Sequence, residues 1–255
     1  MWKRLAAAGV IAAGVAVPLT AAAAGAATTS TTTKTTTTTK TRDVAAERQR
    51  CDAMIDARFA ELTKLDGRVA NAKNLTDGHR QAMTGINSHA RAGLTDLKTK
   101  IDQDSDPAVL KQDCQSIVLD YRIFALRAPQ ENLAIAGDAE ANAIAKLQAL
   151  EPKLQSAIDK AKADGKDVSG AQTALDDLKA KVADAATKDD KVADTVLGYT
   201  PADYNANHDV LTPLRTAVKA ASGDLHAARN DAKTIANDLR GDKAPAKATT
   251  TTVAK

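Results

Sequence analysis

The chain has 255 residues, of which 44% are apolar and 2% aromatic, and its formal net charge at pH 7 is +3. Eight of the 35 basic residues but only one of the 32 acidic residues lie outside residues 43–241, so that segment carries a net charge of −4. A mildly acidic body with its basic excess at the ends argues against a nucleic-acid-binding domain. No stretch alternates apolar and polar residues over a strand's length, which argues against a sheet.

The first residues have the pattern of an export signal. Residues 1–4 form a short basic region with Lys3 and Arg4, residues 5–17 form an apolar run, and residues 24–26 are the small residues that signal peptidase reads. We therefore expect residues 1–26 to be a cleaved signal peptide, and the protein to be secreted, extracytoplasmic and associated with the cell envelope. The alternative is an uncleaved membrane anchor, since the weakly polar run reaches Ala27.

Two polar segments flank the central region. Residues 27–42 are almost entirely threonine with interspersed lysines, and residues 242–255 repeat this composition together with alanine. Segments this polar and monotonous cannot bury a core. Both are therefore predicted to be disordered, the first as a stalk that is a candidate for O-glycosylation and the second as a basic tail.

Apolar residues three and four apart predict helices from residue 43 onward. The first helix is expected over residues 43–73, with Thr76 as the cap of the second. Asp106 followed by Pro107 is typical of a third helix start, where the missing N–H of proline costs nothing. This third helix, expected over residues 106–127, is apolar nearly all round, so we expect other helices to surround it at the centre of a bundle.

The connection after the third helix stays open at Pro129. The residue before a proline is biased away from the helical conformation, which favours a break. Against a break, the apolar register continues at intervals of seven residues with Glu140 as the exception: Leu119, Leu126, Leu133, Leu147, Leu154 and Ala161. A continuous, kinked helix that ends near Gly165 is therefore the alternative.

Heptad patterns in the last third of the chain predict coiled-coil-like packing. The first pattern runs from Val168 to Val192, in a helix expected to end at Gly198. The second follows a helix start at Thr200 and Pro201, and its apolar residues keep spacings of three and four: Leu211, Leu214, Val218, Ala221, Leu225, Ala228, Ala232, Ile235 and Leu239. Because this seam also suits a partner chain, self-association stays open.

The predicted fold class is all-α. We expect an elongated antiparallel bundle of about six helices, arranged as a disulfide-linked three-helix bundle at residues 43–128 and a second, coiled-coil-like three-helix unit at residues 129–241. Cys51 and Cys114 each lie eight residues past the start of a predicted helix, at Asp43 and Asp106. These two helices run parallel in an up-down-up bundle, so one disulfide is expected in an exported protein. The alternative is two buried free thiols.

No catalytic, phosphate-binding or zinc-binding motif is present in the sequence. The four histidines, which are expected at the surface, lack the spacing of a metal-binding pair on one helix: His79, His89, His208 and His226. Residues 102–113 imitate a calcium loop, but Pro107 occupies the position that requires glycine. We therefore expect no enzymatic activity, no metal and no cofactor.

Tyr199, Tyr204 and Asn205 lie in the most distinctive loop of the chain, which holds two of the three tyrosines. Tyrosines at a corner between helices usually pack against the turn. The alternative is a patch that recognises a partner, since tyrosine is enriched at interfaces. These three residues are the candidate interaction site.

Several segments resemble a group of uncharacterised secreted helical proteins from actinobacteria-like bacteria. They are residues 120–126, 129–130, 165–167 and 200–205 together with Leu197. The resemblance covers roughly residues 50–240. It implies export and a long helical fold, and it brings no known activity, catalytic residue or ligand.

Two functions from different classes follow. The first is a non-enzymatic structural or interaction protein of the cell envelope, whose basic ends contact anionic wall polymers or which binds an envelope protein. The alternative is a soluble extracytoplasmic binding module, either chaperone-like or a ligand carrier, with a groove between helices. No nucleic-acid partner is expected, and membrane contact is expected only if the signal segment is retained.

Overall fold

The computed structural model describes the backbone of residues 32–241 and the side chains of residues 43–241. The chain divides into two units, Met1–Thr39 and Lys40–Lys255, and the account below concerns the second. The predicted signal peptide, residues 27–31 and the predicted tail lie outside the described residues. No strand occurs between residues 32 and 241, so the prediction of an all-α fold is confirmed.

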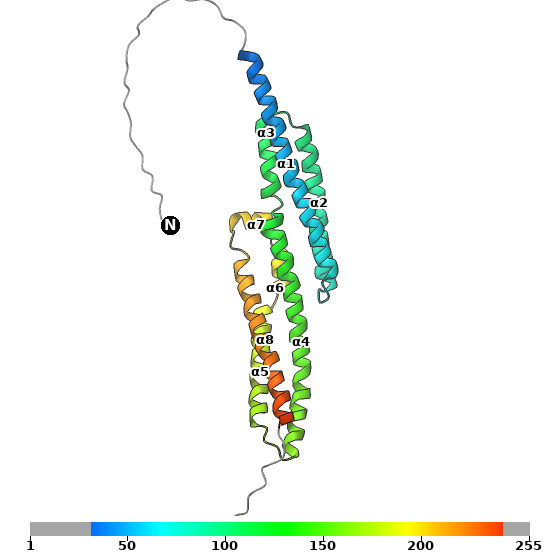
Figure 1. Ribbon diagram of the computed structural model, residues 1–255, viewed down its shortest axis with the longest axis vertical. Coiled ribbons are helices and arrows are strands. Elements are labelled where there is room, and N and C mark those ends of the chain that lie inside the picture. Colours follow the sequence, from blue (N-terminus) through cyan, green and yellow to red (C-terminus); the bar gives the residue numbers. More distant parts are fainter. Residues whose placement is uncertain (1–31, 242–255) are drawn as a thin grey trace, which may run out of the picture. The chain divides into compact units, whose positions relative to one another are not determined.

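The first three helices are α1 (Thr32–Asn71), α2 (Asp77–Gln103) and α3 (Pro107–Leu119), which lie side by side in Figure 1. Helix α1 begins inside the threonine-rich segment that the sequence predicts to be disordered. The difference has a physical reason, because adding a residue to an existing helix costs far less than nucleating a new one. The predicted starts of α2 and α3 are confirmed: Thr76 accepts a hydrogen bond from the His79 amide, and Asp106 accepts one from the Ala108 amide.

The chain breaks at residues 120–122, not at Pro129. Arg122 adopts the left-handed conformation with φ of 46°. The π-helical turn η1 (Ile123–Arg127) then leads directly into α4 (Ala128–Ala163), which carries Pro129 in its first turn. Proline is tolerated there, because the first N–H groups of a helix have no intrahelical partner.

The predicted central helix over residues 106–127 is therefore wrong in two respects. It is interrupted after Leu119, and it is not surrounded on all sides. Leu119 is 43% exposed and Phe124 is 50% exposed, whereas Leu110 and Ile117 are fully buried. The long apolar run consists of two short segments with different buried faces, joined by the break.

Two further predicted helices are also interrupted. Lys191, with φ of 56°, separates α5 (Ser169–Asp189) from α6 (Val192–Gly198). A turn separates α7 (Pro201–Ala206) from α8 (Thr212–Gly241). The predicted start at Thr200 is confirmed, since its side chain and that of Asp203 form a capping box.

Buried side chains gather in three clusters. The first joins α1, α2 and α3 and contains the disulfide between Cys51 and Cys114, whose Cα atoms are 5.5 Å apart, as predicted. The second joins α4, α5 and α8 and contains most of the predicted heptad residues of α5 and α8. Figure 1 shows these three helices side by side.

The third cluster contains residues from both sides of the predicted domain boundary at 128/129. Val69 and Met83 from the first two helices pack in it with Leu126, Leu133 and residues of α6. The division into two three-helix units stays a prediction. No helix within the described residues is both long and apolar enough to cross a membrane.

Candidate functional site

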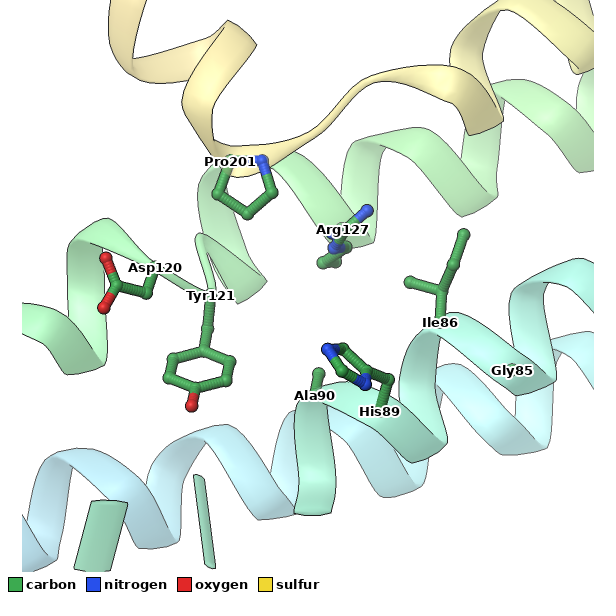
Figure 2. A pocket seen from close by; sticks show the side chains of 8 residues that line it. All are labelled: Gly85, Ile86, His89, Ala90, Asp120, Tyr121, Arg127 and Pro201. Carbon is green, nitrogen blue, oxygen red and sulfur yellow. The ribbon is translucent and has the colours of Figure 1, made fainter. Parts of the chain in front are cut away.

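A pocket of about 470 Å³ lies beside the break between α3 and η1. Figure 2 shows the side chains around it, which come from α2, the break, η1 and α7. The lining residues are Gly85, Ile86, His89, Ala90, Asp120, Tyr121, Arg127 and Pro201. The site is thus assembled from segments that are far apart in the sequence.

Tyr121 forms one wall of the pocket. Its half-buried ring packs against Gly93 of α2, where a Cβ atom would lie only 2.5 Å from the tyrosine hydroxyl. Burial raises the pKa of Tyr121, and the nearby carboxylates of Asp120 and Asp96 raise it further. The hydroxyl is therefore protonated at neutral pH and can donate a hydrogen bond.

Arg127 is the charged group of the opposite wall. Its guanidinium donates to Gln130 Oε1 at 2.9 Å and to the Tyr199 carbonyl at 3.4 Å. Gln130 in turn donates to the carbonyls of Val196 and Tyr199, both at 2.7 Å, and this fixes the end of α6 on the start of α4. Burial lowers the pKa of Arg127, yet an arginine keeps its charge in a protein.

His89 and Asp120 are the other ionisable groups on the pocket wall. Both side chains are exposed, so His89 lies at the surface as the sequence predicts. In Figure 2 the carboxylate of Asp120 points away from the opening, whereas the imidazole of His89 lies near its centre. The charged groups among the lining residues are therefore Arg127 and Asp120, and they carry opposite charges.

The structure places Tyr199, Tyr204 and Asn205 next to this pocket. Asn205 donates to the Leu119 carbonyl at 2.9 Å and accepts from Arg122 Nε at 2.5 Å. The Arg122 guanidinium lies 5.4 Å from the centre of the Tyr204 ring, and Tyr199 packs against the third core cluster. All three residues make contacts within the chain, and Asn205 is itself exposed. Their role in recognising a partner stays a prediction.

His79 forms a polar contact that the sequence analysis missed. Its Nδ1 lies 2.8 Å from Asp138 and its Nε2 lies 3.0 Å from Asp194, so it bridges α4 and α6. The His79 side chain is 20% exposed, so it lies partly at the surface and partly between these two helices. Burial alone would lower the pKa of the imidazole, but the hydrogen bonds to Asp194 and Asp138 outweigh burial and raise it.

A buried pair of carboxyl groups, Glu140 and Asp189, lies between α4 and α5. Each side chain is 8% exposed. Burial, together with the neighbouring Asp189, raises the pKa of Glu140 to about 8, and burial raises that of Asp189 to about 6. Burial therefore opposes full ionisation of the pair at neutral pH. Glu140 is the exception in the apolar register of α4, and this position was the one sequence signal for the pair.

A third buried carboxyl group, Glu131, lies in the first turn of α4. It accepts a hydrogen bond from Asn87 at 2.7 Å, and the same amide donates to Asp66 at 2.9 Å. Burial raises the pKa of Glu131 to about 7. Acidic and amide groups thus line the face of α4 that meets α2 and α6.

Among the described side chains, the one group of three possible metal ligands is Glu47, Cys51 and Cys114. Both sulfur atoms are bonded to each other, so neither is a free thiolate that could coordinate an ion. We therefore interpret Glu47 as a neighbour of the disulfide and not as part of a metal site.

A comparison with models of protein families, with curated proteins and with solved structures found no match for this chain. The resemblance to secreted helical proteins therefore stays an expectation, and functional arguments rest on the chain's own residues.

Proposed function

We propose that this chain is an exported, non-enzymatic protein that acts in the cell envelope as a structural or interaction protein. The observation that carries the proposal is the disulfide between Cys51 and Cys114 inside the first core cluster. Disulfides persist in oxidising compartments and are rare in reducing ones. The export-signal pattern of residues 1–26 is consistent with the same location.

The distribution of charge suggests how such a protein stays in the envelope. Residues 43–241 carry a net charge of −4, whereas every charged residue but one in the flanking segments is basic. Basic ends are attracted to anionic polymers, and an acidic body is repelled by them. The ends would therefore hold the protein on the wall while the helices stay accessible.

The test is to fractionate producing cells into medium, wall and membrane, and to measure the intact mass in each fraction. The proposal expects cleaved protein in the wall fraction, and loss from the wall in a variant that lacks residues 27–42 and 242–255. A control variant keeps the length of the tail but replaces Lys243, Lys247 and Lys255 by glutamine. It separates the loss of positive charge from the loss of chain length. Unchanged wall retention of the double deletion contradicts the role of the ends.

A second function, a soluble binding module, is favoured by the pocket beside the break. Ligand sites are typically concave, largely apolar and equipped with a few polar groups that fix orientation. Native mass spectrometry of protein purified from producing cells tests this role, since a bound molecule adds a discrete mass. Suppression of the aggregation of an unfolded client would instead support a chaperone-like role.

A further inference from the structure

We propose that the pocket beside the break binds a small organic monocarboxylate, whose carboxylate is held by the guanidinium of Arg127. The inference rests on the second proposed function, a binding module, and it names the class of ligand. It is independent of where in the envelope the protein resides.

The first argument is the unused hydrogen-bonding capacity of Arg127. An arginine has five N–H donors, and the two acceptors that the structure gives Arg127 are both reached by one terminal nitrogen, Nη1. Its Nε is buried and has no acceptor among the described atoms. The other terminal nitrogen, Nη2, also has no acceptor among the described residues and is not enclosed, so Nη2 and not Nε is the free donor that a ligand oxygen can reach.

The second argument is the missing counter-charge. Arg91 pairs with Asp66 at 2.8 Å and Arg68 pairs with Glu61 at 3.4 Å, but no described carboxylate lies within 4.0 Å of Arg127. Both of its acceptors are neutral. A half-buried charge without a partner is unfavourable, because the protein interior screens and solvates it poorly. The site is therefore electrostatically complementary to an anion.

The third argument concerns which anion fits. A guanidinium binds a carboxylate through two parallel hydrogen bonds, so a planar anionic group suits Arg127. Much of the remaining wall is apolar, with Ile86, Ala90, Pro201 and the ring of Tyr121 facing a volume of about 470 Å³. Asp120 at the edge disfavours a second negative charge. These features select a monoanion with an apolar or aromatic body.

The test is isothermal titration calorimetry of the full mature chain with phenylacetate and hexanoate, each compared with its neutral amide. We expect one-to-one binding of a carboxylate and affinity at least about tenfold lower for the matched amide, since charge-assisted hydrogen bonds are the stronger ones. Arg127→Gln should weaken carboxylate binding by about tenfold or more and leave amide binding nearly unchanged.

A second variant locates the site without touching Arg127. A Cβ atom on Gly85 would meet no atom within 4 Å, and Gly85 lines the pocket, so Gly85→Leu should fill it and abolish binding. Gly223→Leu is the matched control, because Gly223 also lies on a helix, also has open space and does not line this pocket. Binding by the control should equal that of the unmodified chain.

Three outcomes would overturn the inference. They are equal affinity for carboxylate and amide, unchanged carboxylate affinity in Gly85→Leu, and no binding of either carboxylate at millimolar concentration. If Arg127→Gln fails to fold, the affinities of carboxylate and amide for the unmodified chain and the binding by Gly85→Leu still test the proposal. A neutral molecule found on the purified protein by native mass spectrometry would overturn the carboxylate assignment and leave the binding-module role intact.

Discussion

The ring of Tyr121 packs so closely on Gly93 that a Cβ atom there would lie 2.5 Å from the hydroxyl oxygen and 2.9 Å from the ring carbon Cε1. The glycine therefore makes room for the tyrosine, which lies in the middle of the break between α3 and η1. This contact sets how near the break approaches α2 and hence the width of the pocket.

Gly93→Ala is expected to destabilise the protein by about 1–3 kcal/mol, the usual cost of overpacking. Without crowding, alanine would stabilise the helix by about 1 kcal/mol relative to glycine. A loss of stability therefore indicates crowding by Tyr121, and a gain indicates helix propensity alone. Denaturant unfolding followed by circular dichroism measures it.

The control is Gly67→Ala, because a Cβ atom on Gly67 of α1 would meet nothing within 4 Å. This variant should gain up to about 1 kcal/mol. In a Tyr121→Ala background, Gly93→Ala should also become stabilising. If Gly93→Ala is stabilising in the unmodified chain, the proposed crowding by Tyr121 is wrong.

Removal of the disulfide should lower the free energy of unfolding by about 4 kcal/mol, from the chain entropy of a closed loop of this length. Cys51 and Cys114 are 63 residues apart in the sequence. The double variant Cys51→Ser with Cys114→Ser should unfold at the same denaturant concentration as the reduced unmodified chain. A reductant should have no effect on the double variant, and two alkylated thiols in the untreated protein would contradict the bond.

Local sequence signals predicted the features that depend on neighbouring residues. Thr76, Asp106 and Thr200 were predicted as caps because a cap acts on amides two or three residues away. The heptads of α5 and α8 were predicted because one face of a helix repeats within its own sequence. The disulfide was predicted because Cys51 and Cys114 lie equally far from the expected starts of two parallel helices.

The break at residues 120–122 was not predictable in this way. Its main partner, Asn205, lies 83 residues from Arg122 in the sequence, and Gly93 lies on another helix. Local propensity favours a continuous helix there, and tertiary contacts override it. The pocket was missed for the same reason, because Arg127 and His89 become neighbours only when the break brings η1 to α2.

Asn205→Ala is expected to destabilise the protein by about 1–2 kcal/mol, since it removes two hydrogen bonds and leaves Arg122 Nε and the Leu119 carbonyl without these partners. Urea unfolding measures the change. Asn237→Ala is the control, because Asn237 is an exposed residue of α8, and its effect should stay within about 0.5 kcal/mol. An equally small effect of Asn205→Ala would favour the alternative, a loop that is free to recognise a partner.

The buried carboxyl groups of α4 and α5 predict that stability falls as pH rises from about 5 to about 8.5. The folded pKa values of Glu140, Glu131 and Asp189 are raised to about 8, 7 and 6, so the folded state holds more protons than the unfolded chain in this range. The raised pKa of His79 acts in the same direction, because its stabilising contacts are complete below about pH 6.5 and are lost as pH rises through the folded value. Urea unfolding measured across this pH range gives the slope.

Glu140→Gln should flatten this profile, because the amide is neutral like the protonated carboxyl and does not ionise. We expect the variant to lie close to the unmodified chain near pH 5 and to be more stable by up to about 4 kcal/mol at pH 8.5, because each unit by which folding raises the pKa of Glu140 is linked to about 1.4 kcal/mol. Glu151→Gln, on the same helix but only half-buried, should keep the original slope. A steep slope that persists in Glu140→Gln would mean that Glu140 is not the main group that ionises in this range, and that His79 and Glu131 account for the pH dependence.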